Sequence, residues 1–140
     1  MRYLWIPLAL MTQSALLPLL SLAQDDQECY MMEILRFLVR SRSTWDKFLA
    51  CAADSNDLDS CVGILHDVRN IIRRAQQIEH PPGDFAEVHN LFNKALSAEL
   101  MAIAAFTEWI DRHDQVLLEQ GLDYVRLAVD RQDRALTMLG

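Results

Sequence analysis

The stretch HPPGD at residues 80–84 divides the chain into two halves of similar character. Its two prolines lack backbone donors and disfavour helical angles in the residue before them, while Gly83 permits a sharp turn. On both sides of this stretch apolar residues recur at spacings of three and four, and no sustained two-residue alternation is found after residue 24. The pattern predicts helices throughout, with a chain reversal at residues 80–84.

The first half predicts two helices, over about residues 26–54 and 57–79. The apolar stripe of the first crosses Ser41–Thr44 without slipping, so we expect one continuous helix, with a break near Ser41–Ser43 as the alternative. Asp54-Ser55-Asn56-Asp57 has turn and N-cap composition. The two stripes are Met31, Leu35, Leu38, Arg42, Trp45, Leu49 and Ala52, then Leu58, Cys61, Leu65, Val68, Ile72 and Ala75.

The second half predicts helices over about residues 84–112 and 114–139. Asp111 and Asp114 near the start of the last helix, and three arginines towards its end, complement the helix dipole. Gly121, Ala128 and Ala135 recur every seven residues and would let another helix approach closely. The stripes are Phe85, Val88, Phe92, Ala95, Glu99, Ala102, Phe106 and Trp109, then Leu118, Gly121, Val125, Ala128, Gln132, Ala135 and Leu139.

Short connections favour antiparallel neighbours, so the expected fold is all-α, an up-down-up-down four-helix bundle. The chain has 140 residues, of which 51% are hydrophobic and 24% charged. Residues 24–140 then form a single domain of ordinary composition, large enough to fold without a metal or a dense disulfide network.

Residues 1–23 read as an export signal. Arg2 precedes an apolar stretch from Tyr3 to Leu20, and Ser21-Leu22-Ala23 places small residues where signal peptidase cleaves. We expect cleavage after Ala23 and a secreted or periplasmic (cell-envelope) protein. The alternative is an uncleaved membrane anchor, since 18 residues can just span a bilayer.

The charge balance excludes a broad surface for nucleic acid. The chain has 13 basic and 20 acidic residues and a net charge of −7 at pH 7. Nucleic acids and anionic lipids attract surfaces of the opposite sign. We therefore expect no nucleic-acid partner, and contact with a membrane only through an uncleaved signal.

The layout is similar to that of uncharacterised bacterial secreted or envelope proteins. It consists of an export signal, an early cysteine, a helical hairpin, the segment PPGDFAEVHNLFNKAL at residues 81–96 and the segment DQVLLEQGLDYVRLAVDRQDRAL at residues 114–136. The resemblance covers nearly all of the mature chain and implies an extracytoplasmic helical bundle. It implies no catalytic residue.

Cys51 and Cys61 are equidistant from Asn56, the centre of the first predicted turn. Residues equidistant from the turn of an antiparallel hairpin face each other, so we expect a Cys51–Cys61 disulfide, with two buried thiols as the alternative. An exported protein would form it in an oxidising compartment. Cys29 is left over, either half-buried near the start of its helix or available for an intermolecular disulfide.

No pattern of catalytic or cofactor-binding residues is found. His66, His80, His89 and His113 are never three or four apart, and the motifs of c-type haem attachment, di-iron bundles, serine hydrolases and zinc proteases are missing. A non-covalent haem would need Met31 or Met32 opposite His113. We expect no enzyme activity, no cofactor and no metal, and we assign the histidines to solvent-facing or capping roles.

Three polar residues lie on the apolar stripes: Arg42, Glu99 and Gln132. Since a buried charge is costly, each must reach solvent or find a partner. In one interpretation Arg42 extends to the surface and Glu99 lies at the edge of its stripe. In the other, Arg42 pairs with Glu99 in a buried polar layer, with Gln132 hydrogen-bonded nearby, which would fix the helix register. A ligand pocket around such a layer is a third.

The sequence favours a binding or structural role, with an unknown protein or an envelope polymer as partner. One alternative is a carrier of a small ligand such as haem or a lipid, with a cavity lined by Phe92, Phe106 and Trp109. The other is a secreted helical signalling protein. That fold needs long crossover connections, which Asp54–Asp57 and His80–Asp84 are too short to supply.

Overall fold

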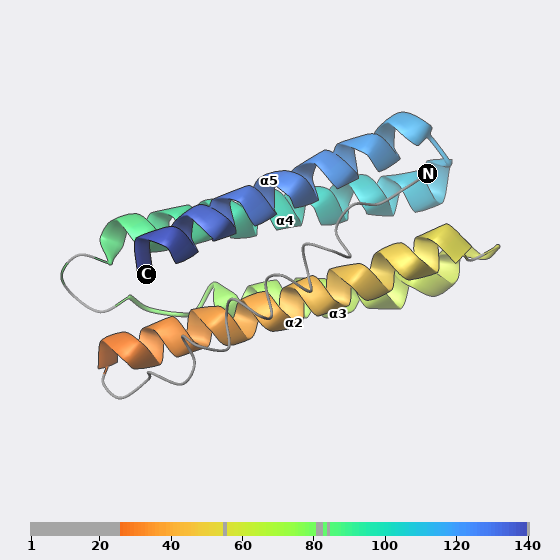
Figure 1. Cartoon of the computed structure of the whole chain (residues 1–140). Helices are drawn as coiled ribbons and strands as arrows, with labels where there is room; N and C mark the ends of the chain where they lie inside the picture. Colours follow the sequence, from red (N-terminus) through yellow and green to blue (C-terminus); the bar gives the residue numbers. More distant parts are fainter. Residues whose placement is uncertain (1–25, 55, 81–82, 84, 140) are drawn as a thin grey trace. The chain divides into compact units, whose positions relative to one another are not determined.

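The structure, a computed structural model, describes residues 26–54, 56–80, 83 and 85–139. These residues form four long helices and one short 3₁₀ helix, and contain no strand (Figure 1). The all-α fold class is therefore confirmed. The chain divides into two compact units, residues 1–79 and 80–140, each containing one helical hairpin.

The first unit begins with α2, Asp26–Asp54, which runs without interruption. The continuous helix predicted for residues 26–54 is thus confirmed, and the alternative break near Ser41–Ser43 is wrong. The hydroxyl of Thr44 donates a hydrogen bond to the carbonyl of Arg40 one turn earlier, 2.7 Å away. A hydroxyl bonded in this way does not compete with the helical backbone for its amides.

The second helix of this hairpin differs from the prediction at both ends. It opens as the 3₁₀ helix η1, Leu58–Cys61, and continues as α3, Val62–Ala75, whereas we expected residues 57–79. Asp57 is the N-cap, and its carboxylate accepts a hydrogen bond from the Asp59 amide at 3.1 Å. After Ala75 the amides of Gln77 and Ile78 bond to carbonyls only three residues back. The ring of Pro81 would clash with the carbonyl four residues earlier in a continued helix, so the helix has to end before this proline.

The second unit consists of α4, Ala86–Arg112, and α5, Gln115–Leu139, which lie side by side in opposite directions (Figure 1). The guanidinium of Arg131 donates to the carbonyl of Lys94 across the hairpin at 3.0 Å. The predicted ranges, 84–112 and 114–139, each begin one or two residues too early.

The turn of this second hairpin depends on two capping residues. His113 adopts left-handed angles, φ 56° and ψ 30°, and its amide donates to the carbonyl of Trp109 at 2.7 Å. Asp114 then accepts a hydrogen bond from the Val116 amide at 3.0 Å. One of the four histidines therefore has the capping role that the sequence predicts, and Asp114 caps the last helix.

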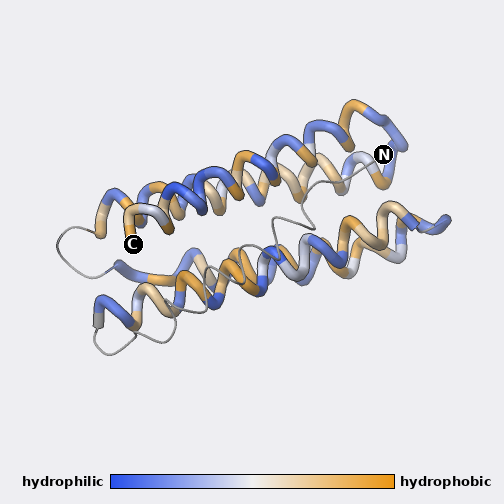
Figure 2. The backbone as a smooth tube through the Cα atoms, viewed as in Figure 1, coloured by the Kyte–Doolittle hydropathy of each residue, from blue (hydrophilic) through white to orange (hydrophobic). Residues whose placement is uncertain are grey.

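Hydrophobic and hydrophilic residues alternate along each helix with the helical repeat (Figure 2). Most residues of the predicted stripes are buried, with Phe92 and Phe106 among the largest. The stripe predicted for the first helix was too narrow, because four further large side chains of α2 are also buried: Tyr30, Ile34, Phe37 and Phe48. The stripe residues near helix ends are only half-buried: Met31, Ala52, Leu58, Phe85 and Leu139. Gly121, Ala128 and Ala135 are all buried on α5.

The predicted export signal, residues 1–23, lies outside the described residues. Among the helices that are described, none is both long and apolar enough to cross a membrane.

Candidate functional site

A groove of about 300 Å³ lies between α2 and α3, at the end of the hairpin remote from the Asp54–Leu58 turn. Its apolar wall comes from both helices and from the residues that follow α3: Phe37, Ile71, Ala75 and Ile78. Phe37 and Ala75 are buried, while Ile71 and Ile78 are half-buried. The groove therefore offers apolar surface at its base and opens to solvent.

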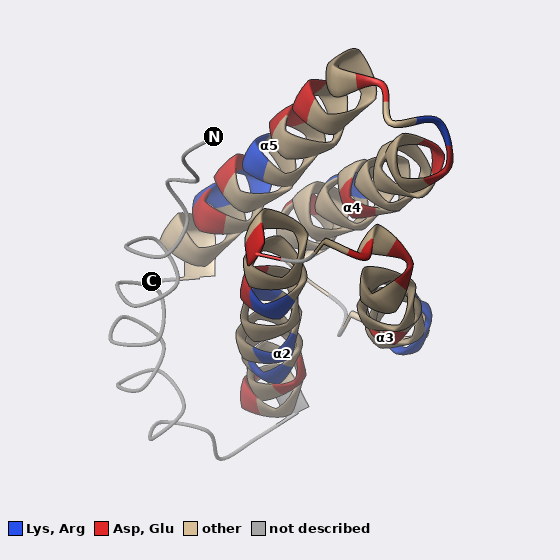
Figure 3. Cartoon of the chain, turned by 90° about the vertical axis from the view of Figure 1, so that its right-hand side faces the viewer, with Lys and Arg blue, Asp and Glu red and all other residues tan. Residues whose placement is uncertain are grey.

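Three arginines line this groove: Arg36 and Arg40 on consecutive turns of α2, and Arg74 in the last turn of α3. All three are exposed. Within the described residues their guanidinium groups form no hydrogen bond or ion pair, and Glu33 is the one acidic residue of the lining. Basic positions (blue) recur along α2 in Figure 3. A chain of net charge −7 thus carries a locally positive groove.

The chemistry of this arrangement suits an anion with an apolar part. A guanidinium presents a rigid fork of donors that matches a carboxylate or a phosphate. Three such groups around an apolar base can hold the head group and cover an aliphatic or aromatic portion. The sequence analysis missed this groove. Its one visible sign was the like-charged pair Arg36 and Arg40, four residues apart, which is unfavourable on an isolated helix.

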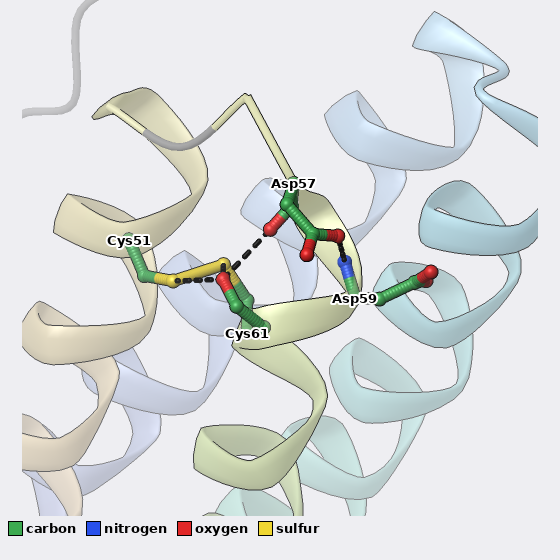
Figure 4. Close-up of a disulfide and its surroundings, with 5 residues drawn as sticks. Cys51, Asp57, Asp59 and Cys61 are labelled. Carbon is green, nitrogen blue, oxygen red and sulfur yellow. Dashed lines mark hydrogen bonds between the residues drawn. A yellow bond between two sulfur atoms is a disulfide. The ribbon is translucent and has the colours of Figure 1, made fainter.

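Cys51 and Cys61 form the predicted disulfide, with their Cα atoms 5.9 Å apart (Figure 4). Ser60 lies beside it: its Oγ is 3.7 Å from Cys51 Sγ and donates to the carbonyl of Asp57 at 2.7 Å. Cys29 is a free, exposed thiol. The bridge lies at the turn of the first hairpin, at the opposite end from the arginine-lined groove.

The three polar residues on the apolar stripes are all buried. The exposed fraction is 7% for Arg42 and 1% for both Glu99 and Gln132. Arg42 belongs to the first unit, and Glu99 and Gln132 belong to the second. The interpretation in which Arg42 extends to the surface and Glu99 lies at the edge of its stripe is therefore wrong. The pairing of Arg42 with Glu99 in one layer stays a prediction.

Asp46 lies one helical turn after Arg42. Burial raises the pKa of the Asp46 carboxyl to about 6, and the positive charge of Arg42 offsets part of that rise. The group therefore changes its charge close to neutral pH.

The histidines fall into two groups. His66 is exposed on α3, and His113 caps α4, whereas His80 and His89 have their ring centroids only 5.0 Å apart. Burial, and then the neighbouring His80, lower the pKa of His89. This pair cannot be recognised from spacings of three or four residues along one helix, because His80 precedes α4 and His89 lies within it. The described residues contain no group of three or more potential metal ligands.

The aromatic residues that would line a carrier cavity are part of the core. Phe92, Phe106 and Trp109 have exposed fractions of 1%, 0% and 8%. The rings of Phe106 and Trp109 pack edge to face, with their centroids 6.5 Å apart. This geometry is typical of core packing.

No protein-family model, curated protein or solved structure matches this chain. The chemistry of its own residues is therefore what supports a functional assignment.

Proposed function

We propose that this chain is an exported helical binding protein that holds a small amphiphilic anion in the groove between α2 and α3. The ligand class is a single apolar chain with a carboxylate or phosphate head. The observation that carries the proposal is the set of Arg36, Arg40 and Arg74 around an apolar base.

The size of the groove favours a small molecule over a protein surface. Its volume of about 300 Å³ lies at the lower end of small-molecule sites, which span roughly 300–1,000 Å³. A stable protein interface buries roughly 800 Å² on each partner and would need to extend well beyond these residues. A protein or envelope-polymer partner is therefore the second candidate, and an enzyme or signalling role has no comparable support.

The role of the arginines follows from their separate origins. Arg36 and Arg40 come from α2 and Arg74 from α3, so a bound head group offsets the repulsion between charges on two helices. Two consecutive turns of α2 also place guanidinium groups within reach of different oxygens of one head group. Ile71 and Ile78 then cover part of the chain that follows the head group.

Two features support the proposal that the protein is exported. Residues 1–23 have the pattern of an export signal, and the Cys51–Cys61 disulfide suits an oxidising compartment. The expected mature N-terminus is Gln24. Mass spectrometry of the protein recovered from the host's envelope or medium tests this, and an intact Met1 form retained in the membrane contradicts it.

The test of binding is calorimetric titration of the mature protein with palmitate and with a monoacyl phosphate, each below its critical micelle concentration. Hexadecanol and hexadecylamine serve as neutral and cationic probes with the same chain. We expect binding of at least one anion, and at least tenfold weaker binding of the neutral and cationic probes. The two anionic probes distinguish a carboxylate from a phosphate ligand.

Variants identify the site. Arg36→Gln, Arg40→Gln and Arg74→Gln should each weaken binding of the anion severalfold, and the triple variant should abolish it. Arg73→Gln is the matched control, because Arg73 is the exposed neighbour of Arg74 but does not line the groove. Equal binding by the wild type and the triple variant, or equal affinity for palmitate and hexadecanol, would overturn the proposal.

A further inference from the structure

We propose that His80 and His89 together bind a divalent transition-metal ion of the Zn²⁺, Ni²⁺ or Cu²⁺ class. Both histidines belong to the second unit, and they share no residue with the arginine-lined groove. The inference therefore stands independently of the proposed function.

The distance between the two rings is one that two imidazoles on a shared metal can have. Zinc binds imidazole nitrogen at about 2.0–2.1 Å, so two imidazoles at tetrahedral positions on one ion have centroids roughly 5 Å apart. The centroids of His80 and His89 are 5.0 Å apart, and the ring planes are inclined at 48°. The inclination also distinguishes this pair from a parallel stack.

The two histidines lie on either side of the two prolines in the sequence. His80 immediately precedes the two prolines, and His89 lies in the first turn of α4, nine residues later. Left-handed backbone at Gly83, with φ 107°, is available at no steric cost only to glycine. The two imidazoles thus lie close together although no helical spacing would place them on one face.

The surroundings permit a metal to enter and hold one ring in place. His80 is exposed, while His89 is half-buried and packs against Phe92, with ring centroids 6.1 Å apart. A fixed ring loses less conformational freedom when it binds a ligand. Imidazole suits zinc, nickel and copper among the divalent ions, and water molecules can complete the coordination shell of a metal held by two imidazoles.

The experiment is a calorimetric titration of the mature protein with Zn²⁺ at pH 7.5, in a Cys29→Ser background that removes the free thiol. We expect one equivalent to bind, and His80→Gln and His89→Gln each to weaken it at least tenfold. His66→Gln and His113→Gln are the matched controls and should change the affinity less than twofold. No binding by the Cys29→Ser protein, or equal losses in all four variants, would overturn the proposal.

A second measurement needs no histidine variant. Substoichiometric Cu²⁺ broadens the NMR signals of nuclei close to it, so the imidazole signals of His80 and His89 should broaden first. Uniform broadening of all four histidines would contradict a paired site. Because the arginines take no part, the Arg36→Gln, Arg40→Gln, Arg74→Gln variant should bind Zn²⁺ as the wild type does, whether or not the anion proposal holds.

Discussion

Gly121 of α5 faces the ring of Phe106 of α4 so closely that a Cβ on Gly121 would lie 2.6 Å from Phe106 Cε1. Both residues are buried. The absence of a side chain at position 121 is thus what lets the aromatic ring occupy the space between the two helices.

Gly121→Ala should therefore destabilise the protein although alanine is the better helix former. Overpacking costs about 1–3 kcal/mol, which exceeds the roughly 1 kcal/mol gained in helix propensity. Gly63→Ala is the matched control: its Cβ would meet nothing within 4 Å, so it should raise stability by about 0.4–1 kcal/mol. Urea unfolding measures both. A stabilised Gly121→Ala protein would show that the ring moves aside at little cost.

Removing the disulfide should lower stability without loss of helix. Cys51 and Cys61 are ten residues apart, and closing a loop of this size stabilises by about 2–3 kcal/mol in the chain-entropy account. Cys51→Ala/Cys61→Ala should therefore melt at a lower temperature with an unchanged far-ultraviolet circular dichroism spectrum. Peptide mapping without reduction should find the Cys51–Cys61 link and an alkylatable Cys29. A link that involves Cys29 would contradict the hairpin.

His113→Gly should stabilise the turn of the second hairpin. His113 has a φ of 56°, where a residue with a Cβ costs about 1–2 kcal/mol, and part of the gain is lost to the greater freedom of glycine in the unfolded chain. We expect a net gain of about 0.5–1 kcal/mol in thermal or urea unfolding. The same substitution at exposed His66 of α3 should instead lower stability by roughly 0.3 kcal/mol, since glycine is a poorer helix former than histidine. Effects of the same sign at both positions would contradict this account.

Asp46 should make stability depend on pH between about 4 and 6. Its folded-state pKa of about 6 lies above the ordinary value of 3.8, so the folded state binds the proton more tightly than the unfolded state. The protonated carboxyl carries no desolvation penalty, and stability is therefore lost as the pH rises through this range. Asp46→Asn should be more stable than the wild type at pH 7.5, and the difference should disappear below pH 4. Chemical unfolding at the two pH values, with EDTA present, measures it, and a constant difference would contradict the assigned titration.

The helices were predictable because each is encoded locally. The stripe through Leu35, Leu38 and Trp45 keeps its phase across Ser41–Ser43, and the Thr44 hydroxyl bonds to the preceding turn without interrupting the helix. The end of α3 was not predictable to the residue. Ile78 continues the apolar spacing, but after Ala75 the backbone amides of Gln77 and Ile78 bond to carbonyls only three residues back.

The disulfide was predictable for a geometric reason, and the groove and the histidine pair were not. Symmetry about Asn56 follows from the turn alone. The groove instead depends on which residues of α2 face Arg74 across the hairpin, and the approach of His80 to His89 depends on the path of the loop between them. Neither is contained in a one-dimensional hydrophobic pattern.

The Cys51–Cys61 disulfide and the arginine-lined groove lie at opposite ends of the first hairpin. At a rise of 1.5 Å per residue, Arg40 and Arg36 lie about 16–22 Å along α2 from Cys51. Over a length of roughly 20 Å, tilting α2 by about 3° relative to α3 at the disulfide changes the distance between the helices at the groove by about 1 Å. The disulfide thus joins α2 to the start of the second helix at one end of the hairpin, while at the groove a small change of tilt is enough to change the separation of the two helices.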